Sequence, residues 1–303
     1  MSLFTSLVVR TLPLMPRALV WRVARRYVAG PTLADAAATV RRLNGEGTMA
    51  TVDVLGEEVS ERARATAAVE DYLRVLASIA SEKLDANISI KPTMFGLKID
   101  EGFCREQIER LVAAAHAQGT FVRIDMEDRT TTDATLRIYR ELHERYGNVG
   151  VVLQAYMRRT LGDIAELPIA GANVRICKGI YVEPRDVAWK GFDTVRAAYV
   201  AALDKLLAQG VYVGIATHDE YLVAAAAALL DRHRVPRERY EFQMLLGVED
   251  ELRKILVAAG HRLRVYVPFG EDWYLYSLRR LRENPAIAGH VTRAVLGLAP
   301  RTG

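Results

Sequence analysis

The residues best suited to chemistry stand near the end of the chain, where Tyr276, Arg279, Arg280 and Glu283 recur at helical spacing. Residues three and four positions apart share one face of a helix, so these side chains are expected to form a single polar stripe. Two neighbouring guanidinium groups with a phenol one turn earlier suit a small carboxylate, because each guanidinium offers paired N–H donors. A solvated cationic face is the alternative interpretation of the two arginines alone.

The stretch before this stripe is typical of a strand followed by a helix. Residues 263–268 alternate and are rich in β-branched side chains, which indicates a strand entering a buried sheet. Gly270 interrupts the run, Asp272 can cap a helix, and helical composition continues over residues 273–283. Because α/β folds build ligand sites just beyond the C-terminal ends of strands, the polar stripe is expected to border a ligand site.

The rest of the chain repeats this order, with eight predicted strands alternating with eight helical segments, one of them over residues 185–209. The predicted strands are residues 48–55, 87–91, 121–125, 149–156, 173–178, 211–217, 240–245 and 263–268. Such alternation implies a parallel sheet, and eight units in 303 residues favour closure into an α/β fold of the (β/α)8 TIM-like barrel type. A doubly wound open sheet is the alternative, but no Gly-x-Gly-x-x-Gly turn follows a strand. We expect an N-terminal helical segment at residues 1–47 and a catalytic barrel at residues 48–303.

Polar residues collect at the last positions of successive predicted strands. They are Lys91, Asp125, Gln154, Arg175, Lys178, Thr217, His218, Asp219, Gln243 and Tyr266. In a barrel these strand ends converge on one mouth, where reactions occur. A single lysine or glutamine at a strand end is usually an ordinary loop residue, but seven strand ends together predict a site. Its cations and amides suit a large anionic cofactor and a small acid.

Each of these residues also has a purely structural interpretation. His218 alone is more often a hydrogen-bonded structural histidine, and Asp219 is most simply the N-cap of the next helix. Asp125 with Glu127 and Asp128 resembles a carboxylate metal site, but no histidine is placed to join them, so no metal is expected.

Composition limits the classes of function. Hydrophobic residues make up 50% and charged residues 26% of the chain, which is typical of a globular protein. The formal charge of +4 is small and its basic residues are not clustered beyond the first quarter, so no nucleic-acid partner is expected. Two cysteines give no disulfide framework, which fits a reducing compartment.

The first 42 residues have a distinct composition. They contain seven arginines and a single acid, Asp35, among apolar side chains, and arginines interrupt every apolar run that could cross a membrane. We expect helices packed on the barrel with exposed arginines; a segment lying on an anionic membrane surface is the alternative.

Several motifs, taken together and in order, resemble the proline dehydrogenase family of the monofunctional type. They are Lys91, Ile124-Asp125, Val152-Leu-Gln-Ala-Tyr156, Arg175-Ile-Cys-Lys-Gly-Ile-Tyr181, Ala216-Thr-His218, Glu241-Phe-Gln-Met-Leu245-Leu-Gly247, Tyr266-Val-Pro-Phe-Gly270 and Tyr276-Ser-Leu-Arg-Arg280. The resemblance runs from about residue 48 to about residue 290.

The resemblance implies a flavoenzyme barrel that oxidises L-proline to 1-pyrroline-5-carboxylate with FAD, the first step of proline catabolism. It implies hydride transfer to flavin N5, electron transfer to a membrane quinone, and a cytoplasmic protein peripheral to the inner membrane. Peripheral membrane contact and self-association are further expectations for its partners.

The family's site residues carry over to matching positions in this chain. The substrate and catalytic set implied is Arg279, Arg280, Lys91, Asp125, Tyr266, Tyr276, Leu245 and Glu57, with Glu57 pairing Arg279 as a lid. The cofactor set implied is Gln154, Arg175, Lys178, Gly179, Ile180, Tyr181, Thr217, His218, Gln243 and Glu283, with Arg175 near flavin N5.

Two departures from the family concern the adenosine side of the cofactor. Asp219 stands where an asparagine is expected, and the span from Tyr266 to Tyr276 is shorter than in bifunctional relatives. Two rival functions remain at this point: a Schiff-base lyase that uses Lys91 or Lys178 as nucleophile, and a non-enzymatic membrane or scaffold protein that uses the basic N-terminal segment.

Overall fold

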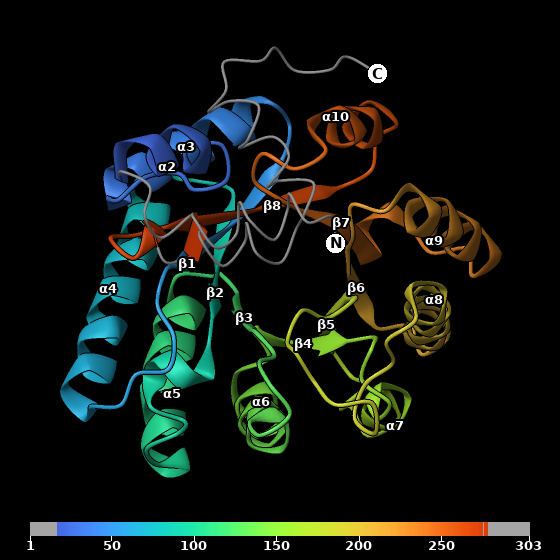
Figure 1. Ribbon diagram of the computed structural model, residues 1–303, viewed down its shortest axis with the longest axis horizontal. Coiled ribbons are helices and arrows are strands. Elements are labelled where there is room, and N and C mark those ends of the chain that lie inside the picture. Colours follow the sequence, from blue (N-terminus) through green and yellow to red (C-terminus); the bar gives the residue numbers. More distant parts are fainter. Residues whose placement is uncertain (1–16, 275, 278–303) are drawn as a thin grey trace, which may run out of the picture.

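The computed structural model describes residues 17–274, 276 and 277, and its centre is a closed barrel of parallel strands (Figure 1). The strands are β1 (Met49–Val54), β2 (Ala86–Ile90), β3 (Val122–Ile124), β4 (Val149–Gln154), β5 (Asn173–Cys177), β6 (Tyr212–Ala216), β7 (Tyr240–Leu245) and β8 (Leu263–Phe269). Each strand pairs with the next along the chain, which confirms the predicted (β/α)8 fold.

The barrel closes through β1 and β8. Their parallel register runs from Met49 opposite Arg264 to Val54 opposite Phe269. Apolar strand residues such as Val52, Ile88 and Val267 are almost completely buried, because strands covered by helices on the outside have no solvent-facing side. Closure of the sheet excludes the doubly wound alternative.

Helices surround the sheet and follow the strands in turn. They are α4 (Arg62–Ser81), α5 (Glu101–Ala117), α6 (Thr132–Tyr146), α7 (Thr160–Ala165), α8 (Phe192–Ala208), α9 (Glu220–Arg232) and α10 (Asp250–Ala258), with the short 3-10 helices η2 (Pro92–Phe95) and η3 (Arg237–Arg239). Each long helix buries one apolar face; in α6 this face carries Leu136, Tyr139 and Leu142. No helix in the described part of the chain is long and apolar enough to cross a bilayer.

Within the described residues, two helices precede the first strand: α2 (Arg17–Ala24) and α3 (Leu33–Gly45). A capping box between Thr32 and Asp35 starts α3, which lies in the helical ring between α10 and α4 (Figure 1). Its residues Ala36, Val40 and Leu43 belong to the barrel's main hydrophobic core. The division at residue 47 stays a prediction, although α3 shares the core of the strands that follow it.

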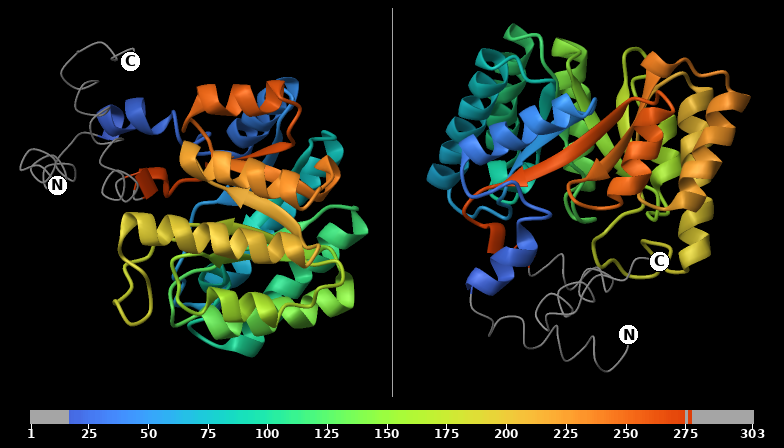
Figure 2. Two further views of the ribbon diagram at one scale, coloured as in Figure 1. Left: turned by 90° about the vertical axis from the view of Figure 1, so that its right-hand side faces the viewer. Right: turned by 90° about the horizontal axis from the view of Figure 1, so that it is seen from above.

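Helix α2 and the segment after β8 lie side by side at the C-terminal end of the barrel (Figure 2). The ring centroids of Trp21 and Trp273 are 4.7 Å apart, and Val28 packs with Leu55 and Tyr276. The backbone N–H of Ala29 also donates to the carbonyl of Pro268 in β8, at 2.9 Å. Helix α2 therefore lies at the same end of the barrel as the strand ends at which the polar residues were expected.

One expected helix begins later than its sequence suggests. We expected it from residue 185, but α8 begins at Phe192. The preceding residues pair instead with the loop after β4: the N–H of Trp189 donates to the carbonyl of Tyr156 and the N–H of Arg158 to that of Val187. The segment instead forms a turn closed by hydrogen bonds to the carbonyl of Pro184, and these contacts hold it out of the helix despite its helical composition.

Candidate functional site

A cavity of about 560 Å³ opens at the C-terminal ends of the strands. It is lined by Lys91, Asp125, Met126, Val152, Gln154, Arg175, Cys177, Lys178, Gly179, Ile180, Tyr181, Phe192, Arg196, Ala216, Thr217, His218, Asp219, Gln243, Met244, Leu245 and Tyr266. Every polar strand-end residue expected from the sequence is in this set. The strand ends therefore converge on a single cavity, as expected for a barrel whose strands all end at one mouth.

The remaining expected site residues divide into two groups. Glu57 and Tyr276 are described but do not line this cavity; Tyr276 is buried in a separate apolar cluster with Val28 and Leu55. Arg279, Arg280 and Glu283 lie outside the described residues. Their roles stay predictions.

Asp125, at the end of β3, is the hub of a buried polar network. Its Oδ1 accepts hydrogen bonds from Arg175 Nη1 at 2.8 Å and from Ser89 Oγ at 2.7 Å, and its Oδ2 accepts one from the Tyr266 hydroxyl at 3.0 Å. The Arg175 guanidinium also lies 5.3 Å from the centre of the Tyr266 ring. Strands β2, β3, β5 and β8 are thus joined across the interior by charge-assisted hydrogen bonds, which hold the side chains rigidly.

Lys91 follows β2 and brings a cation to the same end of the barrel. Its Nζ lies 2.6 Å from Asp53 Oδ1 and 3.4 Å from the Tyr266 hydroxyl, and only 14% of its side chain is exposed. Burial alone would lower the pKa of Lys91, but the carboxylates of Asp53 and Asp125 outweigh it and raise that pKa. Lys91 is therefore held as an ammonium ion.

The outer part of the cavity contains a second cationic cluster. Asp219 accepts hydrogen bonds from Lys178 Nζ at 2.6 Å and, through both oxygens, from Arg196 at 2.8 and 2.7 Å. The same carboxylate caps α9 through the N–H of Tyr221, which confirms its expected capping role. The hydrogen bonds from Arg196, with those from Lys178, lower the pKa of Asp219. Arg196 also stacks on Phe192 and Tyr221, at 4.2 and 4.7 Å from the ring centres.

The two glutamines are fixed by neighbouring groups. Gln154 Nε2 donates to the carbonyl of Glu127 at 2.8 Å, and its Oε1 faces the N–H of Ile180 at 3.4 Å. Gln243 accepts from Arg175 Nε and donates to Glu241. Both amides are buried and orientated, so they can present defined donors and acceptors to a planar polar ligand.

Gly179 needs to be glycine because of its backbone and its surroundings. Its φ is +110°, and a Cβ atom there would lie 2.1 Å from the Tyr156 ring. The Tyr156 hydroxyl donates to the carbonyl of Tyr181 at 3.1 Å, so the Tyr156 side chain packs against the turn that contains Gly179 and Ile180 and fixes its position. The turn brings bare backbone to the wall of the cavity.

His218 acts here as a hydrogen-bond acceptor. The N–H of Leu245 donates to its Nε2 at 2.8 Å, which ties the end of β6 to the end of β7. The neighbouring Thr217 hydroxyl accepts the N–H of Asp219 at 3.1 Å. His218 therefore has a structural hydrogen bond as well as a place in the cavity lining.

Sequence reasoning missed three polar or aromatic residues of the site: Asp53, Phe192 and Arg196. Asp53 had a visible signal, since it is the one charged residue in its strand. Phe192 and Arg196 lie on α8 and reach the cavity only through the tertiary position of that helix. No sequence pattern at the strand ends points to them.

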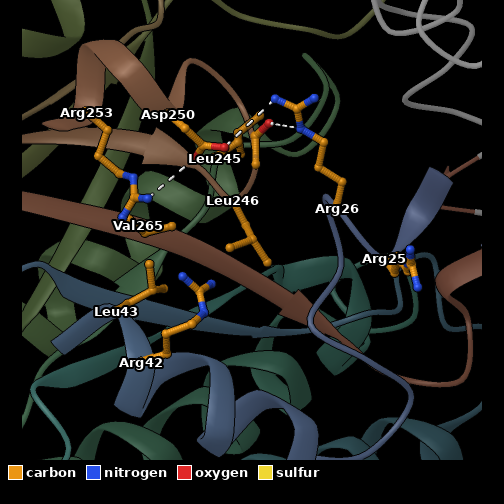
Figure 3. Close-up of a pocket in the computed structure, with 10 residues that line it drawn as sticks. Arg25, Arg26, Arg42, Leu43, Leu245, Leu246, Asp250, Arg253 and Val265 are labelled. Atoms are coloured by element: carbon orange, nitrogen blue, oxygen red, sulfur yellow. Dashed lines mark hydrogen bonds and ion pairs between the residues drawn. The ribbon is translucent and has the colours of Figure 1, made fainter. Parts of the chain in front are cut away.

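A second cavity of about 240 Å³ lies beside α3 and the β7–α10 loop (Figure 3). Its lining includes four arginines: Arg25, Arg26, Arg42 and Arg253. Three of them form ion pairs with nearby carboxylates. Arg253 lies 2.7 Å from Glu46, which also binds Arg42, and Arg26 lies 3.8 Å from Asp250. Leu245 borders both cavities, so this arginine-lined cavity lies directly behind one wall of the candidate site.

The thiols and possible metal ligands add no further chemistry in the described part of the chain. Burial raises the pKa of Cys104, whose thiol donates to the carbonyl of Pro92. No group of three or more His, Cys, Asp or Glu residues among the described positions is arranged to hold a metal ion. The cations and amides described above are the groups best placed to bind ligands.

Comparisons with known proteins show the family and the fold of this chain. The sequence model of the family described as proline dehydrogenase matches residues 36–293. The chain is 36% identical over 273 residues to proline dehydrogenase 1 of Bacillus subtilis subsp. natto, covering 90% of each chain. It is 35% identical over 287 residues to the proline dehydrogenase of Deinococcus radiodurans, covering 93% of each. The crystal structure of proline utilization A from Bdellovibrio bacteriovorus superposes with a TM-score of 0.80 at 22% identity, over 92% of this chain and 36% of that one, and so supports the fold.

Proposed function

The chain belongs to the proline dehydrogenase family, oxidoreductases that act on CH–NH groups, and we propose that it oxidises L-proline to 1-pyrroline-5-carboxylate with FAD bound in the barrel cavity. The observation that carries this proposal is the combination of a charged, buried Lys91 with the Asp125–Arg175–Tyr266 network at the inner end of the cavity. In a cyclic amino acid, the fixed cation would bind the carboxylate and the aromatic side chain of Tyr266 would pack against the ring.

The inner end of the cavity is the proposed substrate pocket. Lys91, Arg279 and Arg280 would hold the carboxylate of proline, because cations with N–H donors bind carboxylates by charge-assisted hydrogen bonds. Tyr266, Tyr276 and Leu245 would wall the ring. Asp125 would hold Tyr266 and Arg175 in place through the hydrogen bonds already described, and Glu57 would close over the substrate with Arg279.

The remaining lining fits a flavin dinucleotide. Buried amides of Gln154 and Gln243 and the guanidinium of Arg175 suit the polar edge of a flavin ring. The ribityl chain and pyrophosphate would lie against the backbone of residues 179–181 and the side chains of Lys178, Thr217 and His218, which offer charged and neutral hydrogen-bonding groups. Glu283 is proposed for the adenosine side. When bound, FAD accepts the hydride that leaves C5 of proline.

The protein's own contribution is to bind, orient and polarise. Hydride leaves C5 most readily when the ring nitrogen is neutral, because its lone pair then forms the C=N bond of the product. Lys91 and Arg175, together with Arg279 and Arg280, favour the neutral amine, since nearby positive charges lower an amine's pKa. The same cations stabilise the negative charge that develops on the hydride acceptor.

The charged state of Lys91 disfavours a Schiff-base lyase on this barrel. A lysine nucleophile must be neutral, and its pKa is usually lowered for that purpose, whereas the carboxylates beside Lys91 raise it. Lys178 is held by Asp219 at 2.6 Å. Neither amine is prepared for attack on a carbonyl.

We propose that a membrane quinone reoxidises the flavin and that the enzyme works in the cytoplasm, at the surface of the inner membrane. The arginines of the N-terminal segment support this placement, because α2 lies at the same end of the barrel as the cavity. Basic residues beside an open site can hold it close to an anionic membrane. Self-association remains a further proposal for the same segment.

Spectroscopy and a dye-linked assay together test the proposed function. The purified protein should be yellow, acid precipitation should release FAD into the supernatant, and L-proline should reduce a soluble dye. D-Proline and L-pipecolate serve as matched controls for stereochemistry and ring size. A colourless protein that gains no flavin spectrum when FAD is added would contradict the assignment.

A further inference from the structure

Asp53 is a fully buried carboxylate on β1 that faces the interior of the barrel. Its Oδ1 accepts a hydrogen bond from Lys91 Nζ at 2.6 Å, and the Tyr72 hydroxyl oxygen lies 3.3 Å from the same atom. Its Oδ2 is buried without a hydrogen-bond partner among the described residues. An isolated buried carboxylate is costly, so a position that retains one calls for a specific explanation.

The surroundings of Asp53 show what the carboxylate serves. The hydroxyl of Tyr72 in α4 does not donate its proton to Asp53, because it donates to the carbonyl of Ser89 at 2.7 Å. Asp125 of β3 has Arg175 of β5 as its cation, so Lys91 is the only described cation within ion-pair distance of Asp53. The Asp53–Lys91 pair and the Asp125–Arg175 pair lie side by side, with the Tyr266 hydroxyl between Lys91 and Asp125.

Lys91 retains one N–H for a ligand in this arrangement. An ammonium group has three N–H donors. One is directed to Asp53 and one to Tyr266, so the third has no partner among the described residues. Lys91 lines the cavity, and the third N–H is therefore available to a bound carboxylate.

We propose that Asp53 is a positioning residue for substrate binding: it anchors the ammonium of Lys91 and keeps it charged so that its remaining N–H meets the carboxylate of a cyclic amino acid. This inference rests on the proposed function and adds a residue to its site. Asp53 does not contact the substrate; it acts through Lys91 alone.

The proposal predicts a specific pH dependence. The titratable groups that face Lys91 are Asp53, Asp125, Glu127 and the phenol of Tyr266, and Tyr72 lies behind Asp53. If Asp53 becomes asparagine, burial of Lys91 is opposed by fewer negative charges, and its pKa must fall relative to the wild type. Below the lowered pKa Lys91 stays charged, and above it the charge is lost.

The test is equilibrium binding of tetrahydrofuran-2-carboxylate, which has the ring and carboxylate of proline but oxygen in place of nitrogen. It cannot form an imine and has no amine to titrate, so it reports on the carboxylate site. Calorimetry should be done between about pH 6 and about pH 9 on flavin-loaded wild type, Asp53→Asn, Lys91→Met and the double variant. Asp163→Asn is the control, because it removes a buried carboxylate paired with Arg159 on the outer helix α7.

We expect Asp53→Asn to bind the analogue roughly tenfold or more weakly than the wild type at the alkaline end, with the loss growing as pH rises. Asp163→Asn should follow the wild-type curve. The double variant should bind the analogue as weakly as Lys91→Met alone, because Asp53 acts only through Lys91. It should also unfold at a higher temperature than Lys91→Met, because it lacks the carboxylate that Lys91→Met leaves buried and unpaired.

Two results would overturn the role of Asp53 while leaving the proposed function intact. One is a wild type that binds the analogue and oxidises proline while Asp53→Asn shows an unshifted pH curve. The other is an equal loss of binding on Asp53→Asn with and without Lys91. If the wild type itself neither binds the analogue nor oxidises proline, the proposed function fails, and the role of Asp53 fails with it.

Discussion

Arg175 of β5 and Asp125, which directly follows β3, form a buried ion pair across the barrel interior, with Nη1 and Oδ1 2.8 Å apart. Their side chains are only 8% and 13% exposed. The pair joins the proposed substrate pocket to the proposed flavin pocket, because Asp125 also accepts from Tyr266 and Arg175 donates to Gln243. A change at either residue should therefore affect both ligands.

Asp125→Asn should lower the unfolding free energy by about 1–3 kcal/mol, because Arg175 loses a charged partner in a buried place. It should also lower kcat/KM for proline by about tenfold or more, through the displaced Arg175 and Tyr266. Glu101→Gln is the matched control: its pair with Arg137 has the same 2.8 Å separation but is exposed, so less than about 1 kcal/mol is expected. Urea unfolding and steady-state kinetics measure both effects; equal behaviour of the two variants would disprove the role of Asp125 as a hub.

Gly179→Ala should destabilise the protein and reduce its flavin content. The new methyl group would meet the Tyr156 ring at 2.1 Å in a backbone with positive φ. Gly119→Ala separates the two effects, because Gly119 also has positive φ but has open space around it. Backbone strain alone should cost Gly119→Ala about 1–2 kcal/mol without loss of flavin. Thermal unfolding and the flavin-to-protein ratio decide the matter, and a normal flavin content in Gly179→Ala would count against the turn as a cofactor wall.

Glu241 should make the stability of the fold depend on acidic pH. Burial alone would raise the pKa of its carboxyl, but Arg264, 2.8 Å away, outweighs burial and lowers the value to about 2. Unfolded glutamate titrates near pH 4.3, so the ion pair contributes fully above about pH 5 and is lost as pH falls toward about pH 2. The contribution is on the order of 3 kcal/mol.

Urea unfolding of wild type and Glu241→Gln at several pH values tests this stabilisation. The variant should be less stable at neutral pH, because it leaves Arg264 buried without its carboxylate. The difference between the two proteins should shrink as pH falls through about 4 to about 3. A difference that stays constant over that range would show that Glu241 is not ionised in the folded protein.

The barrel and most of the site lining could be predicted from the sequence because strand ends are local features. Each strand carries its own apolar pattern and its own terminal polar residue, and barrel closure then brings these ends together. Lys91, Arg175, Lys178 and Gln243 meet in the cavity for that reason.

The parts that could not be predicted depend on contacts between distant segments. Arg196 reaches the cavity because α8 begins at Phe192 and not seven residues earlier, and that start is set by hydrogen bonds to the β4–α7 loop. Asp53 faces inward because of its register with β8, where it lies opposite Pro268. A strand pattern alone does not say which face of a barrel strand a side chain occupies when both faces are buried.

The two arginines outside the described residues give a prediction that depends on their chemistry alone. If Arg279 and Arg280 both bind the carboxylate of proline, each charge-assisted hydrogen bond should contribute about 1.5–3 kcal/mol to the binding free energy. Arg280→Met should then lower kcat/KM for proline by roughly tenfold to a hundredfold, and lysine should restore only part of it, because it lacks the planar fork. Arg137→Met, in an exposed ion pair, is the control. Wild-type kinetics in both Arg279→Met and Arg280→Met would support a solvated cationic face.

The most direct test of the central claim is anaerobic mixing of the purified protein with L-proline while the flavin absorbance is followed. The oxidised flavin band should be lost in a single turnover, with one equivalent of 1-pyrroline-5-carboxylate formed per flavin. The rate should rise from about pH 6 to about pH 9, because the substrate amine must lose its proton before hydride leaves. If L-proline leaves the oxidised flavin band unchanged in protein shown to contain FAD, the enzyme does not oxidise proline through its flavin.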